Sequence, residues 1–152
     1  MILHVFNPEH DIALASNLSN FTAPYAGRTL RSDLGFLPAL WVEDHDAVLV
    51  DDVALAKERY DEMLRRAGLP SHTPRFVSKH TIPSMHLTRI EPWGWDMALR
   101  FQLKRMGVGE NMLPTTDEIE YIRNLSHRQY GAQVLKSLQR DGTTGEAFCC
   151  HE

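Results

Sequence analysis

One short apolar run, Ala47-Val48-Leu49-Val50, constrains the fold of this chain most strongly. The run has no polar alternation and ends at Asp51 and Asp52, which is typical of a parallel-sheet strand buried on both faces. The following residues, 53–67, have the apolar spacing of an amphipathic helix, with Asp52 able to cap its start and Gly68 able to end it. A strand followed directly by a helix is the unit from which parallel sheets are built.

The amino-terminal third of the chain repeats this organisation less regularly. Residues 1–6 form a strand-like apolar run, and the apolar stretch 12–15 predicts one helical turn after it. From Pro24 onward the apolar positions recur at helical spacing, and Pro38 is expected to divide two short helices. On these helices Arg28, Arg31 and Asp33 are expected to face solvent or a crevice.

Two more strands and one helix are predicted in the middle of the chain. Residues 75–78 and 86–90 are strand-like, although prolines interrupt the sequence around them. Apolar residues from Trp95 to Met106 then follow the i, i+4, i+8 and i+11 positions of a helix that stops near Gly107.

The carboxyl-terminal part is predicted to be helical. Capping boxes starting at Thr115 and Ser126 predict helices over residues 117–125 and 127–140, with Asp141-Gly142 ending the second helix. The apolar residues expected to face a core are Ile119, Ile122 and Leu125 on the first helix and Tyr130, Val134, Leu135 and Leu138 on the second.

Strands alternating with helices predict an α/β fold with a small, mainly parallel sheet, flanking helices and a helical carboxyl-terminal part. The predicted α/β domain covers residues 1–125, and residues 126–152 follow it. A chain of 152 residues is long enough for one core, and its 43% hydrophobic and 24% charged residues are ordinary for a globular protein.

Charge and hydropathy exclude several classes of partner. The net charge is −4 and the 16 lysines and arginines are spread along the chain, so the basic patch of a nucleic-acid-binding protein is missing. No apolar run approaches the roughly 20 residues needed to cross a bilayer, and residues 1–6 do not resemble a secretion signal. We therefore expect a cytoplasmic protein that binds neither nucleic acid nor membranes.

The two cysteines, Cys149 and Cys150, are adjacent and close to the end of the sequence. Together with His151 they fall short of the four ligands of a structural metal site, so we interpret them as incidental thiols.

The loop after the first strand is the strongest candidate for a site. Asn7, Glu9, His10 and Asp11 lie within five residues, at the position where α/β sheets bind ligands. Carboxylates and an imidazole can bind a cation or act as acid and base. The alternative is that Asn7 forms a turn while Glu9 or Asp11 caps the next helix. No glycine-rich fingerprint is present, which disfavours a dinucleotide or P-loop site.

The loop before the predicted helix at Trp95 is the second candidate. Trp93 and Trp95 flank Gly94 and could form a flat wall for a ligand, with Asp96 near the helix start. In the structural alternative, the tryptophans pack in the core and at a helix end, and Asp96 complements the helix dipole or pairs with Arg100. We expect Trp93, Asp96 and Asp51, which follows another strand, to contribute to binding a small-molecule substrate.

The sequence Ser126-His127-Arg128 does not predict a serine hydrolase. Neighbouring residues on a helix point in different directions, and no Gly-x-Ser-x-Gly elbow occurs in the chain. The simpler interpretation is that Ser126 caps the helix that follows it.

Three stretches together resemble the amino-terminal region of uncharacterised bacterial ATP-grasp proteins. They are Phe6-Asn7-Pro8-Glu9-His10-Asp11-Ile12-Ala13-Leu14-Ala15, Pro92-Trp93-Gly94-Trp95-Asp96 and Leu125-Ser126-His127-Arg128, and Ser32-Asp33-Leu34-Gly35-Phe36-Leu37-Pro38-Ala39-Leu40-Trp41 adds to the likeness. In such proteins a Rossmann-like pre-ATP-grasp domain helps to bind the substrate. The ATP-grasp domain that follows holds ATP and magnesium and joins a carboxylate to an amine or thiol through an acyl phosphate.

The resemblance implies a substrate-binding domain that is inactive alone. Residues 126–152 would then be a linker helix and the start of a following ATP-grasp domain, which would be the partner of this chain and would bind the ATP and magnesium. No complete set of phosphate clamps and metal ligands is recognisable in the sequence, so we expect no cofactor in this chain and interpret it as a fragment or a stand-alone relic.

Two hypotheses from other classes stay open at this point. One is a small cation-dependent hydrolase or lyase that uses Glu9, His10 and Asp11. The other is a non-catalytic interaction module that forms a homodimer through the tryptophan loop. The sequence leaves open whether the chain is an enzyme.

Overall fold

The computed structural model describes residues 1–70 and 74–140. The chain divides into two compact units, Met1–Thr115 and Thr116–Glu152, here called the first and second unit. The domain boundary between residues 125 and 126 stays a prediction.

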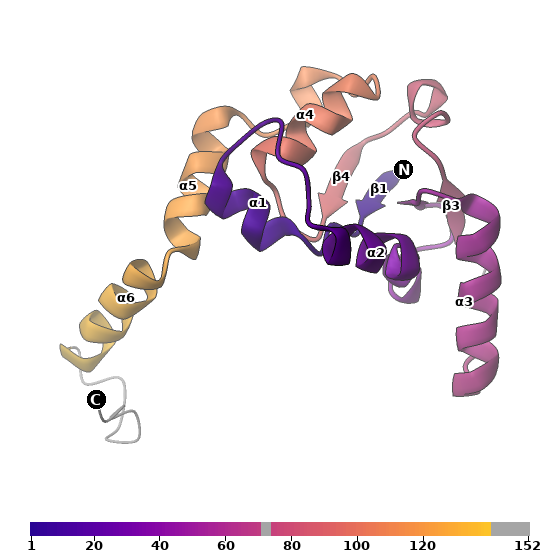
Figure 1. The fold of residues 1–152 in the computed structure, drawn as a ribbon, viewed down its shortest axis with the longest axis horizontal. Helices are drawn as coiled ribbons and strands as arrows, with labels where there is room; N and C mark the ends of the chain where they lie inside the picture. Colours follow the sequence, from indigo (N-terminus) through magenta and orange to yellow (C-terminus); the bar gives the residue numbers. More distant parts are fainter. Residues whose placement is uncertain (71–73, 141–152) are drawn as a thin grey trace. The chain divides into compact units, whose positions relative to one another are not determined.

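Four parallel strands form the sheet of the first unit (Figure 1). Their spatial order is β3-β2-β1-β4, where β1 is Ile2–Val5, β2 is Ala47–Leu49, β3 is Arg75–Val77 and β4 is Arg89–Pro92. In the register, Leu3 of the central strand β1 pairs with a residue on each neighbour. The predicted α/β fold with a small parallel sheet is confirmed, and it is Rossmann-like.

The position of β4 corrects the strand predicted at residues 86–90. β4 begins at Arg89 because it pairs residue for residue with β1, from Ile2 opposite Arg89 to Val5 opposite Pro92. The backbone N–H of Thr88 donates to the carbonyl of Met1 just before the strand. Pro92 is tolerated because β4 is an edge strand, where a residue without an N–H leaves no partner strand unpaired.

Strand β2 is buried on both faces, as its apolar sequence predicts. Ala47 and Leu49 pack with one hydrophobic cluster, which includes Leu99 and Leu103 of helix α4 (Met97–Arg105). Val48 and the following Val50 pack with a second cluster, which includes residues of helix α3 (Val53–Ala67). Alternating residues of one strand therefore join the sheet to helices on its two faces.

Helix α3 has the predicted bounds and caps. The Asp52 carboxylate accepts a hydrogen bond from the Leu55 N–H at 3.0 Å, and Gly68 ends the helix with a left-handed φ of 65°. Tyr60 is buried, and its hydroxyl donates to the Ala39 carbonyl at 3.2 Å. Burial, with a smaller contribution from the neighbouring Asp61, raises the pKa of Tyr60. The phenol is therefore neutral in the folded protein at ordinary pH.

Short helical segments connect the strands. α1 (His10–Ser16) follows β1 and is longer than the single turn predicted. Two short helices, α2 (Tyr25–Leu34) and η1 (Leu37–Leu40), are present as predicted, but Pro38 does not divide them, because it lies in the first turn of η1, where a missing N–H is tolerated. η2 (Ile82–Ser84) precedes β4, and η3 (Glu110–Met112) follows α4. α1 contacts α4, and α3 contacts β3.

In the described part of the second unit, two helices follow one another, α5 (Thr116–Ser126) and α6 (Arg128–Arg140). The predicted capping role of Ser126 is wrong, because this residue ends α5 and its hydroxyl donates to the Ile122 carbonyl at 2.9 Å. The His127 ring instead accepts from the Gln129 N–H at 3.2 Å. An imidazole nitrogen takes the place of the hydroxyl expected at the start of α6.

The apolar stripe predicted on α6 is present, but its side chains do not face a core. Tyr130, Val134, Leu135 and Leu138 are all more than a third exposed, and so is Leu125 on α5. The spacing of the apolar residues predicts the helix correctly, because this spacing has the helical period. It does not indicate which part of the protein covers the apolar side of the helix.

None of the helices in residues 1–70 and 74–140 is long and apolar enough to cross a membrane. The predictions for Asp141-Gly142 and for Cys149 and Cys150 lie outside the described residues.

Candidate functional site

The carboxyl edge of the sheet is the natural place for a ligand in this topology. The chain builds β2 and β3 on one side of β1 and then places β4 on the other side. The connection after β1 therefore leads to one side of the sheet, whereas β4 lies on the other side. α/β proteins bind ligands outside the carboxyl ends of strands at such a switch point. Both candidate loops lie there, since one follows β1 and the other follows β4.

Asn7 joins the two candidate loops. Its amide nitrogen donates to the Gly94 carbonyl at 2.8 Å and lies 3.2 Å from the Asp96 carboxylate, while its amide oxygen accepts from the Gly94 N–H at 3.3 Å. Only 1% of the residue is exposed, so the amide is used within the protein. The two candidate loops are therefore in direct contact.

Asp96 is the cap of helix α4 and the second member of this network. One carboxylate oxygen accepts from the Leu99 N–H at 2.8 Å, and the other faces Asn7 and the His10 ring, whose Nδ1 is 3.5 Å away. The alternative pairing of Asp96 with Arg100 does not occur, because Arg100 contacts Glu110 and the Pro114 carbonyl. Asp96 is 2% exposed.

Gly94 lets the His10 ring lie against the backbone. A Cβ on Gly94 would fall 2.3 Å from Cδ2 of His10, closer than any real contact. The glycine therefore permits a close approach to the backbone, and the group that approaches is the His10 ring of the other loop.

Glu9 is not part of this hydrogen-bond network and pairs instead with Arg31 on α2. Its carboxylate lies 2.6 Å from Nη2 of Arg31, with 9% of the Glu9 side chain and 24% of the Arg31 side chain exposed. Glu9 stands at the start of α1 but makes no side-chain cap. Oε2 of Glu9 and Nε of Arg31 are buried without a hydrogen-bond partner.

The remaining predicted residues lie apart. Asp11 is exposed on the first turn of α1 and lines neither cavity described below. Trp93 is 63% exposed, with its ring edge-on to Phe6 at 5.6 Å between ring centroids. Trp95 is partly buried against the core, which is the structural alternative predicted for it.

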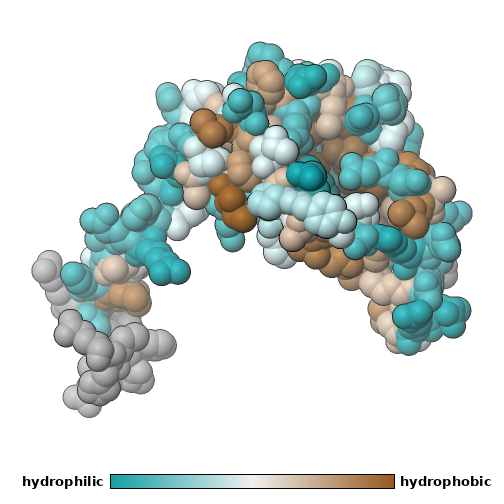
Figure 2. Space-filling model, in the orientation of Figure 1, coloured by the Kyte–Doolittle hydropathy of each residue, from teal (hydrophilic) through white to brown (hydrophobic). Residues whose placement is uncertain are grey.

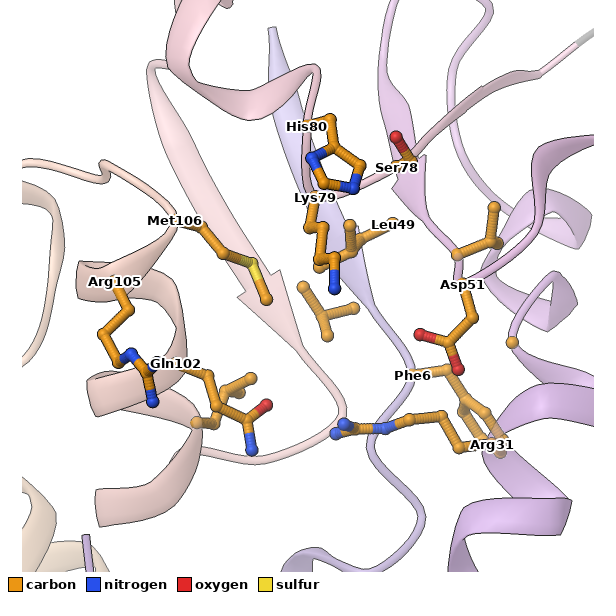
Figure 3. A pocket seen from close by; sticks show the side chains of 14 residues that line it. Phe6, Arg31, Leu49, Asp51, Ser78, Lys79, His80, Gln102, Arg105 and Met106 are labelled. Atoms are coloured by element: carbon orange, nitrogen blue, oxygen red, sulfur yellow. The ribbon is translucent and has the colours of Figure 1, made fainter. Parts of the chain in front are cut away.

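The larger of two adjoining cavities has a volume of about 530 Å³ and lies at the carboxyl ends of β1, β2 and β3 (Figure 3). Figure 3 shows Lys79 and Arg31 extending into it, with Gln102 on the opposite wall and the Asp51 carboxylate on the β2 side. Its polar and charged lining residues are Arg31, Asp51, Ser78, Lys79, His80, Gln102 and Arg105.

The smaller cavity, of about 250 Å³, shares Arg31, Asp51, Leu99 and Gln102 with the larger one. Its polar and charged lining residues are Glu9, Thr22, Arg28, Arg31, Asp51, Asp96 and Gln102. The two cavities therefore adjoin, with Arg31 lining both, and are together called the crevice here. Figure 2 shows hydrophilic and hydrophobic residues interspersed over the visible face of the first unit.

Three of the predicted site residues, Glu9, Asp51 and Asp96, line this crevice. Sequence reasoning missed Lys79, Gln102 and Arg105. Lys79 could have been found, because Ser78-Lys79-His80 directly follows a predicted strand. Gln102 and Arg105 carried no separate signal, since polar residues on a helix usually face solvent.

The side chains of Glu9, His10 and Asp11 do not converge on one point. Glu9 pairs with Arg31, the His10 ring faces Asp96, and Asp11 is exposed. Among the described residues, no group of three histidines, cysteines or acidic residues is placed to hold a metal ion.

Comparisons with protein-family models, with curated proteins and with solved structures give no match.

Proposed function

We propose that the first unit is a substrate-binding domain that holds a small anionic molecule in the crevice at the carboxyl edge of its sheet. The observation that supports this most directly is the placement of Lys79 and Arg105 on one cavity with a single carboxylate, Asp51, while the third cation there, Arg31, is paired with Glu9. A surplus of cations in a partly enclosed space attracts a carboxylate or a phosphate ester.

We further propose, from the resemblance of the sequence, that this domain serves an ATP-grasp-type carboxylate ligase. A Rossmann-like parallel sheet with a ligand-sized crevice is the architecture that the resemblance implies for a pre-ATP-grasp domain. ATP and magnesium would then bind to a following ATP-grasp domain. In this proposal the protein acts in the cytoplasm, and this chain positions the carboxylate without transferring the phosphoryl group.

Calorimetric titration of the 152-residue protein with a panel of small mono- and dicarboxylates and phosphate esters tests the binding proposal. We expect at least one class of anion to bind, and the double variant Lys79→Gln/Arg105→Gln to bind it at least about 10-fold more weakly, since each lost charged contact is worth about 1 kcal/mol or more. The matched control is Lys57→Gln/Arg65→Gln on α3, which removes the same charges outside the crevice. If no anion in the panel binds, or both double variants behave alike, the proposal is wrong.

Titration with ATP and magnesium tests the second part. Tight, magnesium-dependent binding of ATP by this chain alone would contradict the assignment of the nucleotide to a following domain.

A further inference from the structure

The two parts of the crevice differ in charge. The larger cavity is lined by the cations Arg31, Lys79 and Arg105 and by one carboxylate, Asp51, and Arg31 is paired with Glu9. In the smaller cavity, the carboxylates of Glu9, Asp51 and Asp96 outnumber the guanidinium groups of Arg28 and Arg31. One end of the crevice is therefore suited to an anion and the other end to a cation.

Glu9 is the carboxylate best placed to receive a cation in the smaller cavity. Nine-tenths of its side chain is buried, one oxygen contacts Arg31, and the other oxygen has no hydrogen-bond donor. A buried acceptor without a donor destabilises the protein, so a ligand that supplies an N–H removes this cost. The terminal torsion of a glutamate is broad, which allows the carboxylate to turn toward the cavity.

The carboxylate of Asp96 is already used, because it caps α4 and contacts Asn7. It contributes negative charge to the smaller cavity without being available as a full hydrogen-bond partner. Asp51 is exposed and lines both cavities, so it lies where the two ends of a ligand would meet.

We infer that the crevice takes a zwitterion of the amino-acid type, with its ammonium group beside Glu9 in the smaller cavity and its acidic group beside Lys79 and Arg105 in the larger one. This inference rests on the proposed function and narrows it to a substrate class. A ligand with only anionic groups would bring negative charge toward Glu9 and Asp96, and a purely cationic ligand would meet Arg31 and Lys79.

The test uses three probes that differ by one group. L-glutamate carries an ammonium and two carboxylates, glutarate lacks the ammonium, and 4-aminobutyrate keeps the ammonium and one carboxylate. In calorimetric titrations of the 152-residue protein, we expect L-glutamate to bind at least about 10-fold more tightly than glutarate, because glutarate lacks the ammonium contact. We expect 4-aminobutyrate to bind as well, because it keeps one ammonium and one acidic group.

Equal or tighter binding of glutarate would overturn the inference while leaving the binding of an anion intact. If none of the three probes binds while another anion of the wider panel does, the zwitterion assignment is also wrong. The proposed function itself fails only when the whole panel fails, so the two failures are distinguishable.

Substitutions in the crevice test where the ammonium group of the ligand binds. Glu9→Gln should lower the preference for L-glutamate over glutarate from at least about 10-fold to near one, with glutarate still bound, because the amide removes the negative charge from that end. Glu58→Gln, an exposed residue of α3, is the matched control and should keep the preference. Asp51→Asn provides a second variant that does not disturb the pair with Arg31, and it should reduce the preference partially. An unchanged preference in both crevice variants would overturn the assignment.

Discussion

Two groups of residues lie at the carboxyl edge of the sheet and have different roles. The joined group, consisting of Asn7, His10, Gly94 and Asp96, connects the loop after β1 to the loop after β4. The open group, consisting of Asp51, Lys79 and Arg105, lines the larger cavity.

The difference lies in burial and in hydrogen bonding. Asn7 and Asp96 are 1% and 2% exposed and use their polar atoms on each other and on backbone groups. Asp51, Lys79 and Arg105 are exposed at the cavity. A position at the carboxyl end of a strand therefore does not by itself make a residue a ligand contact, because the loops there must also be fixed to one another.

The largest expected effect comes from the joined group. Asp96→Ala should lower the free energy of unfolding by about 3 kcal/mol, since it removes a helix cap and leaves the buried Asn7 amide without one partner. Chemical denaturation measures the change. Asp52→Ala removes the same kind of cap from α3 at an exposed position and should cost only about 1 kcal/mol. Equal costs for the two variants would break the distinction between the two groups.

A smaller effect is expected at the contact between the two loops. Gly94→Ala should destabilise the protein by about 2 kcal/mol, because the new Cβ overlaps the His10 ring. Combining it with His10→Ala should recover part of this loss, and a double-mutant cycle from denaturation curves measures the coupling. Strictly additive losses would show that the ring and the glycine do not depend on each other.

Arg31 pairs with the mostly buried Glu9 and also lines the larger cavity, so its substitution should have an intermediate effect on stability. Arg31→Met should cost about 1.5 kcal/mol, because it leaves the mostly buried Glu9 carboxylate without its cation. The control is Arg59→Met, which breaks the exposed pair with Asp33 and should cost no more than about 0.5 kcal/mol. Thermal or chemical denaturation of both variants shows whether burial increases the contribution of the ion pair to the free energy of unfolding.

The smallest effect on stability is expected for the open group. Lys79→Gln should change the free energy of unfolding by less than about 0.5 kcal/mol, because an exposed side chain away from core contacts contributes little. The same variant should weaken binding of the anion found in the titrations. A large loss of stability with unchanged binding would place Lys79 in the joined group instead.

Sequence reasoning found the elements of the first unit because each depends on local rules. Helix α3 has the predicted bounds since its apolar period, its Asp52 cap and its Gly68 stop all agree. The fourth strand was misplaced by three residues at its start, because its limits depend on pairing with β1 rather than on its own composition. The capping role of Ser126 failed for a similar reason, since the folded backbone includes Ser126 in α5 and places the His127 ring at the start of α6.

For the candidate site, the sequence predicted residues at the carboxyl edge of the sheet, where the two cavities lie, and the site itself stays a prediction. Asn7 and Asp96, both predicted to bind a substrate, make hydrogen bonds between the two loops, and Asp96 also lines the smaller cavity. Lys79 and Arg105 are 26 residues apart in the sequence and line one cavity only because β3 and α4 come together in the fold.

The sequence by itself determined that this protein has short parallel strands separated by helices, because periodicity, caps and turn residues act over a few neighbouring positions. Only the tertiary structure decided which polar side chains are satisfied within the protein and which face the crevice. That choice depends on contacts between segments almost 90 residues apart, such as Asn7 with Gly94, and no local rule reports them.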